Sequence, residues 1–129
     1  MSQDATVELI RSLVQNLDGP QVDWDGWQSM SMILEFPGGR FNSAHGFLYS
    51  PDGTISAVAC RPTRVLPAVD AYVRSKYSAG DAPALKMLVR FDRTAGQYEV
   101  LFEESDEKRW QITPDNLNEI HADLRPSFD

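Results

Sequence analysis

The last third of the chain decides how the fold is read, because residues 84–128 are ALKMLVRFDRTAGQYEVLFEESDEKRWQITPDNLNEIHADLRPSF. Apolar and polar residues alternate over Leu85–Asp92 and again over Gln97–Glu103, and a period of two residues is typical of a strand. The polar stretch Arg93–Gly96 lies between these segments and ends in glycine. The sequence therefore predicts a β-hairpin over residues 85–103.

A helix is expected to follow this hairpin. Thr113 supplies a capping hydroxyl, Pro114 suits the first helical position, and Asp115 places an acid in the first turn. Arg125-Pro126 ends the helical pattern. The stripe expected to face the sheet consists of Leu117, Ile120, His121 and Leu124.

The first two thirds of the chain add three strands and two helices to this pattern. Short turns separate the three predicted strands, which are Gln28–Phe36, Phe41–Tyr49 and Thr54–Cys60. Helical spacing of apolar residues predicts helices over Ala5–Leu17 and from Thr63 to about Tyr77. The order α-β-β-β-α-β-β-α predicts a single α+β domain over residues 1–129, with an antiparallel sheet and helices packed on one face.

Composition narrows the possible partners and the compartment. The 129 residues carry a net charge of −7, so nucleic acid and anionic membranes are not expected to bind, whereas a cationic protein would be attracted. No apolar run approaches the ~20 residues that span a bilayer, and the N-terminus has no basic start before an apolar stretch, unlike a secretory signal. A single cysteine, Cys60, excludes an internal disulfide. We therefore expect a cytoplasmic protein.

The sequence carries little that suggests covalent chemistry. Neither His45 nor His121 belongs to a metal-binding spacing, so no metal and no cofactor are expected. Cys60 and His45 fall on adjacent predicted strands, and a cysteine–histidine pair is the one enzymatic alternative. The small residues beside Cys60 instead favour a packed, inert thiol. The chain is not expected to be an enzyme.

Two groups of residues are candidates for binding a partner. The first is the acidic cluster Glu99, Glu103, Glu104, Asp106 and Glu107. It is either a solvated loop or a surface for the lysines and arginines of a partner. The second group is Asp23, Trp24 and Asp25, because tryptophan often anchors binding interfaces. Trp27 and Trp110 are instead expected to cover the core.

Several segments resemble a known family. They are the opening VELIRSLVQNL (7–17), an early tryptophan, FNSAHGFLYSPDG (41–53) and YEVLFEESDEKRW (98–110). Together they resemble the YezG-like immunity proteins of bacterial polymorphic toxin systems. The ending ITPDNLNEIHADLRPSF (112–128) is similar to immunity proteins paired with contact-dependent toxins.

This resemblance, which spans nearly the whole chain, implies a protein that is not an enzyme. It would bind the C-terminal toxic domain of a cognate toxin, often a nuclease, as a monomer in a one-to-one complex. The acidic surface would then block a basic active cleft.

The element order and the small acidic chain also resemble type III secretion chaperones. Those proteins are dimers that hold an extended segment of an effector. A chaperone should expose an apolar face on its second helix for its twin, but residues 65–77 carry only one clear apolar stripe. One stripe is enough to pack on the chain's own sheet, which favours the monomeric interpretation.

Overall fold

The computed structural model describes residues 2–19, 26–77, 84–106, 108–111, 113, 116, 119–120 and 124. Within these ranges, two helices and six strands form one α+β domain, which confirms the predicted fold class. Their bounds are α1 Ser2–Gln15, β1 Leu17–Asp18, β2 Ser29–Glu35, β3 Ser43–Tyr49, β4 Ile55–Cys60, α2 Pro62–Lys76, β5 Lys86–Asp92 and β6 Gln97–Glu103, with a 3-10 turn at Pro37–Gly39.

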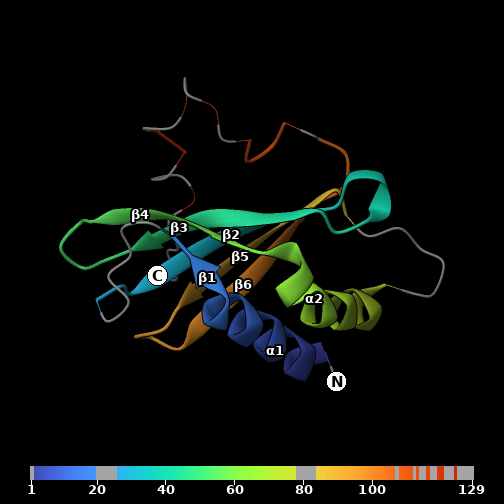
Figure 1. The fold of residues 1–129 in the computed structure, drawn as a ribbon, viewed down its shortest axis with the longest axis horizontal. Helices are drawn as coiled ribbons and strands as arrows, with labels where there is room; N and C mark the ends of the chain where they lie inside the picture. The colour runs from blue at the N-terminus through green and yellow to red at the C-terminus, as the bar shows by residue number, and fades with distance from the viewer. Residues whose placement is uncertain are drawn as a thin grey trace.

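The sheet is antiparallel throughout and has the order β1-β4-β3-β2-β5-β6 (Figure 1). Strands β2, β3 and β4 form the predicted meander. The chain then passes through α2 and returns as β5, which pairs with the free side of β2 so that Ser29 lies opposite Asp92 and Glu35 opposite Lys86. β2 is therefore central, and β6 is the outer strand beyond β5.

Strand β1 corrects the prediction that the first helix runs to Leu17. Leu17 pairs with Cys60 and Asp18 pairs with Ala59 on β4. A strand of two residues is too short to show a period of two, so the apolar Leu17 matches the helical spacing equally well.

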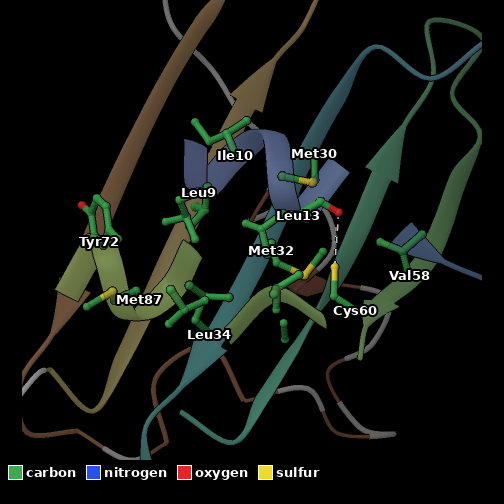
Figure 2. Close-up of a cluster of buried hydrophobic side chains, with 14 of the residues drawn as sticks. Leu9, Ile10, Leu13, Met30, Met32, Leu34, Val58, Cys60, Tyr72 and Met87 are labelled. Atoms are coloured by element: carbon green, nitrogen blue, oxygen red, sulfur yellow. Dashed lines mark hydrogen bonds between the residues drawn. The ribbon is translucent and has the colours of Figure 1, made fainter. Parts of the chain in front are cut away.

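Both helices lie on the same side of the sheet (Figure 1). The inward face of β2 supplies Met30, Met32 and Leu34, all fully buried, as the alternation in the sequence predicts. Leu9 and Leu13 of α1 pack against this face (Figure 2). Burying each such side chain contributes about 1.5–3 kcal/mol, so this layer is the main core.

The opposite face of the sheet carries a second, smaller apolar cluster. It consists of Ile33, Phe47, Tyr49, Leu88, Ile120 and Leu124, with Trp110 partly buried against it. Ile120 and Leu124 belong to the C-terminal segment. The expectation that all helical segments pack on one face is therefore wrong, because the apolar side chains of Ile33 and Leu88 require cover on this face as well.

Part of the predicted final helix is described. Thr113 donates its backbone N–H to Asn116 Oδ1 at 2.8 Å, and Asn116 donates its own to Thr113 Oγ1 at 3.3 Å. The amide of Leu124 donates to the carbonyl of Ile120 at 2.9 Å, which is helical spacing. Leu117 and His121 lie outside the described residues.

Glycine is required at one position inside the sheet. A Cβ atom on Gly46 of β3 would lie 1.9 Å from the carbonyl oxygen of Ser31 on β2. Only a residue without a side chain permits β3 to approach β2 this closely.

Candidate functional site

The segment that follows β6 is a tightly bonded acidic turn, defined here as residues Glu103–Asp106. The Glu103 carboxylate accepts a hydrogen bond from Arg109 Nη1 at 2.8 Å. It also accepts the backbone N–H groups of Ser105 at 3.2 Å and Asp106 at 3.1 Å. The Arg109 bond, followed by these amides, lowers the pKa of Glu103 to about 2. Glu103 therefore holds the turn in shape.

Arg109 and Trp110 connect this turn to the sheet. The Arg109 guanidinium lies 4.4 Å from the centroid of the Trp110 ring, and Lys86 Nζ donates to the Arg109 carbonyl at 2.9 Å. Trp110 has a φ of 62°, which costs a residue other than glycine about 1–2 kcal/mol. Packing of Trp110 on the second cluster offsets this strain and confirms that Trp110 covers the sheet.

The predicted acidic cluster divides into paired and exposed carboxylates. Glu99 bonds to Arg90 at 3.0 Å and Glu103 to Arg109, whereas the side chains of Glu104 and Asp106 are exposed. The Glu104 carboxylate also interacts with the Tyr77 hydroxyl. Asp106 Oδ1 also accepts the backbone N–H of Lys108 at 2.9 Å. Glu107 lies outside the described residues, as does the second candidate group of Asp23, Trp24 and Asp25. The structure therefore leaves Glu104 and Asp106 as the carboxylates that the turn presents to solvent.

A half-buried polar row, which sequence analysis missed, lies beside this turn on the same face of the sheet. The Lys86 side chain is 7% exposed, and its Nζ lies 3.6 Å from Glu35 Oε2. Ser43 Oγ donates to Glu35 Oε1 at 3.0 Å, and His45 Nδ1 lies 3.7 Å from that atom. Only the register of the strands reveals this row, since Glu35 lies directly opposite both Ser43 and Lys86.

Burial is the main influence on the pKa of His45 in this row. Desolvation lowers the pKa of His45, although the nearby Glu35 carboxylate acts in the opposite direction. A hollow of about 330 Å³ adjoins the row and is lined by Glu35, Pro37, Gly38, Asn42, Leu85 and Lys86. Because Lys86 already donates to the Arg109 carbonyl, we assign this lysine to positioning the acidic turn.

The cysteine–histidine pair considered from the sequence is not formed. Cys60 lies opposite Ala44, and His45 lies opposite Ala59. Side chains of adjacent residues project from opposite faces of a sheet, so the thiol and the imidazole are on different sides. Cys60 Sγ donates to the Leu13 carbonyl at 3.3 Å (Figure 2), and burial raises the pKa of the thiol to about 12.

Two further arrangements are not found in the part of the chain that the structure describes. No group of three or more histidine, cysteine, aspartate or glutamate residues there is placed to hold a metal ion. No helix there is both long and apolar enough to cross a membrane.

The apolar stripe of α2 packs within the chain's own core, against α1 and the sheet. Val65, Val69 and Tyr72 are buried there, and Tyr72 stacks on Phe102 of β6 with ring centroids 6.4 Å apart. Within the described part of α2, Leu66 is the one large apolar side chain that is exposed. The apolar face that a chaperone would offer to its twin is therefore reduced to a single residue.

Comparisons of the chain with protein-family models, with curated proteins and with solved structures find no match.

Proposed function

We propose that this chain is an immunity protein that binds and neutralises the toxic C-terminal domain of a cognate bacterial toxin. It acts in the cytoplasm as a monomer in a one-to-one complex, and its target is a basic domain of the nuclease type. The observation that carries the proposal is the acidic turn. In that turn, internal bonds to Glu103 hold the exposed carboxylates of Glu104 and Asp106 in a defined place.

A rigid acidic turn is suited to binding a cationic surface. Association costs free energy for every side chain and loop that becomes ordered, and the bonds among Glu103, Arg109 and the turn amides meet that cost during folding. The net charge of −7 would also accelerate the encounter with a basic protein, most strongly at low salt. A nuclease cleft that binds polyanions is such a surface.

The test is co-purification of the protein with the C-terminal domain encoded by the gene immediately upstream. Glu104 and Asp106 are changed together to lysine, while Glu103 is left intact because it holds the turn. The matched control reverses Asp18 and Asp70, acids that lie on β1 and α2, so that both double variants have the same net charge. Like charges facing each other in an interface cost several kcal/mol.

The first double variant should therefore bind on the order of 100-fold more weakly than the control. Equal affinity of the two double variants would remove the acidic turn from the interface. Failure of the unaltered protein to bind any toxin domain would refute the immunity function. Recovery of an effector's N-terminal segment on a dimer would point to the chaperone alternative instead.

A further inference from the structure

The outer strand β6 presents hydrogen-bonding groups that β5 does not use. The amide of Arg93 donates to the Gln28 carbonyl at 3.0 Å, and that of Phe36 donates to the Leu85 carbonyl at 2.8 Å. Leu85 and Arg93, which flank β5, thus bond toward β2, and so do the odd-numbered residues between them. The even-numbered residues of β5 therefore bond toward β6.

The register then determines which residues of β6 face outward. The even-numbered residues of β5 lie opposite Gln97, Glu99, Leu101 and Glu103. The N–H and C=O groups of Tyr98, Val100 and Phe102 therefore point away from the sheet. No strand among the described residues pairs with β6 on that side.

This edge has few of the features that usually protect an outer strand. Short length, proline, bulges and lysine commonly prevent further strands from adding to a sheet. β6 has seven residues, QYEVLFE, without proline or lysine, and its pairing with β5 is unbroken from Gln97 to Glu103. Strand β1 at the opposite edge has only two residues.

An apolar groove lies on the helix side of the sheet, at the Tyr98 end of this edge. Val7, Ile10 and Val14 of α1 line it together with Phe91 and Tyr98, and its volume is about 380 Å³. Val7 is 37% exposed, although large apolar side chains are usually buried. Figure 1 shows α1 on the same side of the sheet as α2, with β6 as the strand beyond β5.

The other side of the edge is acidic. Glu99 and Glu103 project from β6 away from the helices, where they pair with Arg90 and Arg109. The exposed carboxylates of the acidic turn follow directly. A strand added along β6 would place the side chain opposite Tyr98 beside the apolar groove. Side chains toward the other end of that strand would lie beside the acidic turn.

We infer that β6 accepts an extended segment of the toxin domain as an additional strand of the sheet. The segment places an apolar residue in the groove beside α1 and, toward its other end, basic residues beside the exposed carboxylates of Glu104 and Asp106. The inference rests on the proposed function for the identity of the partner, and it extends that function by naming the edge and the conformation that the partner adopts.

The first experiment uses the free protein and needs no partner. Amide hydrogen exchange measured by NMR should show fast exchange at Tyr98, Val100 and Phe102, and slow exchange at Glu99 and Leu101, whose amides bond to β5. Protection of the three outward amides in the free protein would overturn the inference. Protection that disappears on dilution would assign the edge to a second copy of the chain and would also overturn it.

The second experiment adds the C-terminal domain of the toxin encoded immediately upstream. The outward amides should become protected in the complex. Val100→Pro removes an outward N–H without removing a bond to β5, whereas the control Val100→Thr keeps that N–H and the β-branched shape. The proline variant should bind at least about tenfold more weakly than the threonine variant.

Two side-chain substitutions test the same edge without altering the backbone. Val7→Glu places a charge in the groove, and Leu66→Glu places the same charge at the comparably exposed Leu66 on α2. The first variant should lose at least about tenfold in affinity, and the second should bind normally.

These outcomes separate the edge inference from the proposed function. Normal binding by Val100→Pro and Val7→Glu, combined with weakening by the Glu104 and Asp106 reversals, would overturn the edge inference and leave the immunity function standing. Absence of binding by the unaltered protein would refute the immunity function itself. A Val100→Pro variant that fails to fold would leave the decision to Val7→Glu and to the exchange of the outward amides.

Discussion

Replacing Lys86 with methionine tests whether the half-buried polar row supports the fold. The Lys86 side chain is 7% exposed and donates to the Arg109 carbonyl at 2.9 Å. Methionine keeps the length and apolar stem of lysine, so loss of packing is small. Loss of a hydrogen bond made by a charged donor such as Lys86 costs about 1.5–3 kcal/mol.

Loss of the ion pair between Lys86 and the Glu35 carboxylate destabilises the fold less than loss of the hydrogen bond to Arg109. Glu35 is 32% exposed and lies 3.6 Å from Lys86 Nζ, so solvent screens the pair to about 1 kcal/mol or less. Glu35 also keeps its hydrogen bond from Ser43. We therefore expect Lys86→Met to lower the free energy of unfolding by about 2–3 kcal/mol, which corresponds to a fall in Tm of about 10 °C for a domain of this size.

The assay is urea denaturation followed by far-UV circular dichroism, with Lys108→Met as the matched control. Lys108 is exposed beside the acidic turn, so the same substitution there should change stability by less than about 0.5 kcal/mol. A double-mutant cycle with Glu35→Gln should give a coupling free energy below about 1 kcal/mol. Equal stabilities of the Lys86 and Lys108 variants would refute the reasoning, because the Arg109 carbonyl would then not depend on Lys86.

Three further predictions concern stability and reactivity. Gly46→Ala should lower the free energy of unfolding by about 3 kcal/mol in a urea titration, because its Cβ would lie 1.9 Å from the Ser31 carbonyl oxygen; an unchanged midpoint would contradict this. Because burial raises the Cys60 pKa from 9.0 to about 12, a disulfide reagent at pH 8 should react with the native thiol about 1000-fold more slowly than with the urea-unfolded thiol. The folded-state pKa of Glu103 is lowered from 4.5 to about 2, so its stabilising effect is present above about pH 4.5 and is lost as the pH falls toward 2. The difference in Tm between the unaltered protein and Glu103→Gln should therefore shrink over that range, and a difference independent of pH would refute this assignment.

Local periodicity was enough to predict the core strands. Met30, Met32 and Leu34 recur at every second position, and the structure places all three on the buried helix side. The same alternation identified β5 and β6, because every second residue of a half-buried strand must be apolar. Trp27, expected to cover the core, is 3% exposed.

Features that depend on pairing between distant segments were not accessible in this way. The ion pair of Arg90 with Glu99 requires the hairpin register, and the contact of Lys86 with Glu35 requires β5 to lie against β2. Periodicity within a segment carries no information on which strands become neighbours. For that reason the acidic cluster looked uniform in the sequence, whereas the structure divides it into carboxylates that hold the turn and carboxylates that face solvent.

The position of β2 between β3 and β5 has a consequence for synthesis on the ribosome. The meander β2–β4 and the hairpin β5–β6 each form from segments that are close in sequence. The pairing of β2 with β5, which joins them, brings Ser29 opposite Asp92. Contacts between residues so far apart in the chain form late and slowly. Until β5 leaves the ribosome, the nascent chain therefore carries β2 with one side unpaired, and Ile33 lacks the cover of Leu88 and the C-terminal segment. Aggregation of this protein is most probable during that interval, and faster release of the last third of the chain would reduce it.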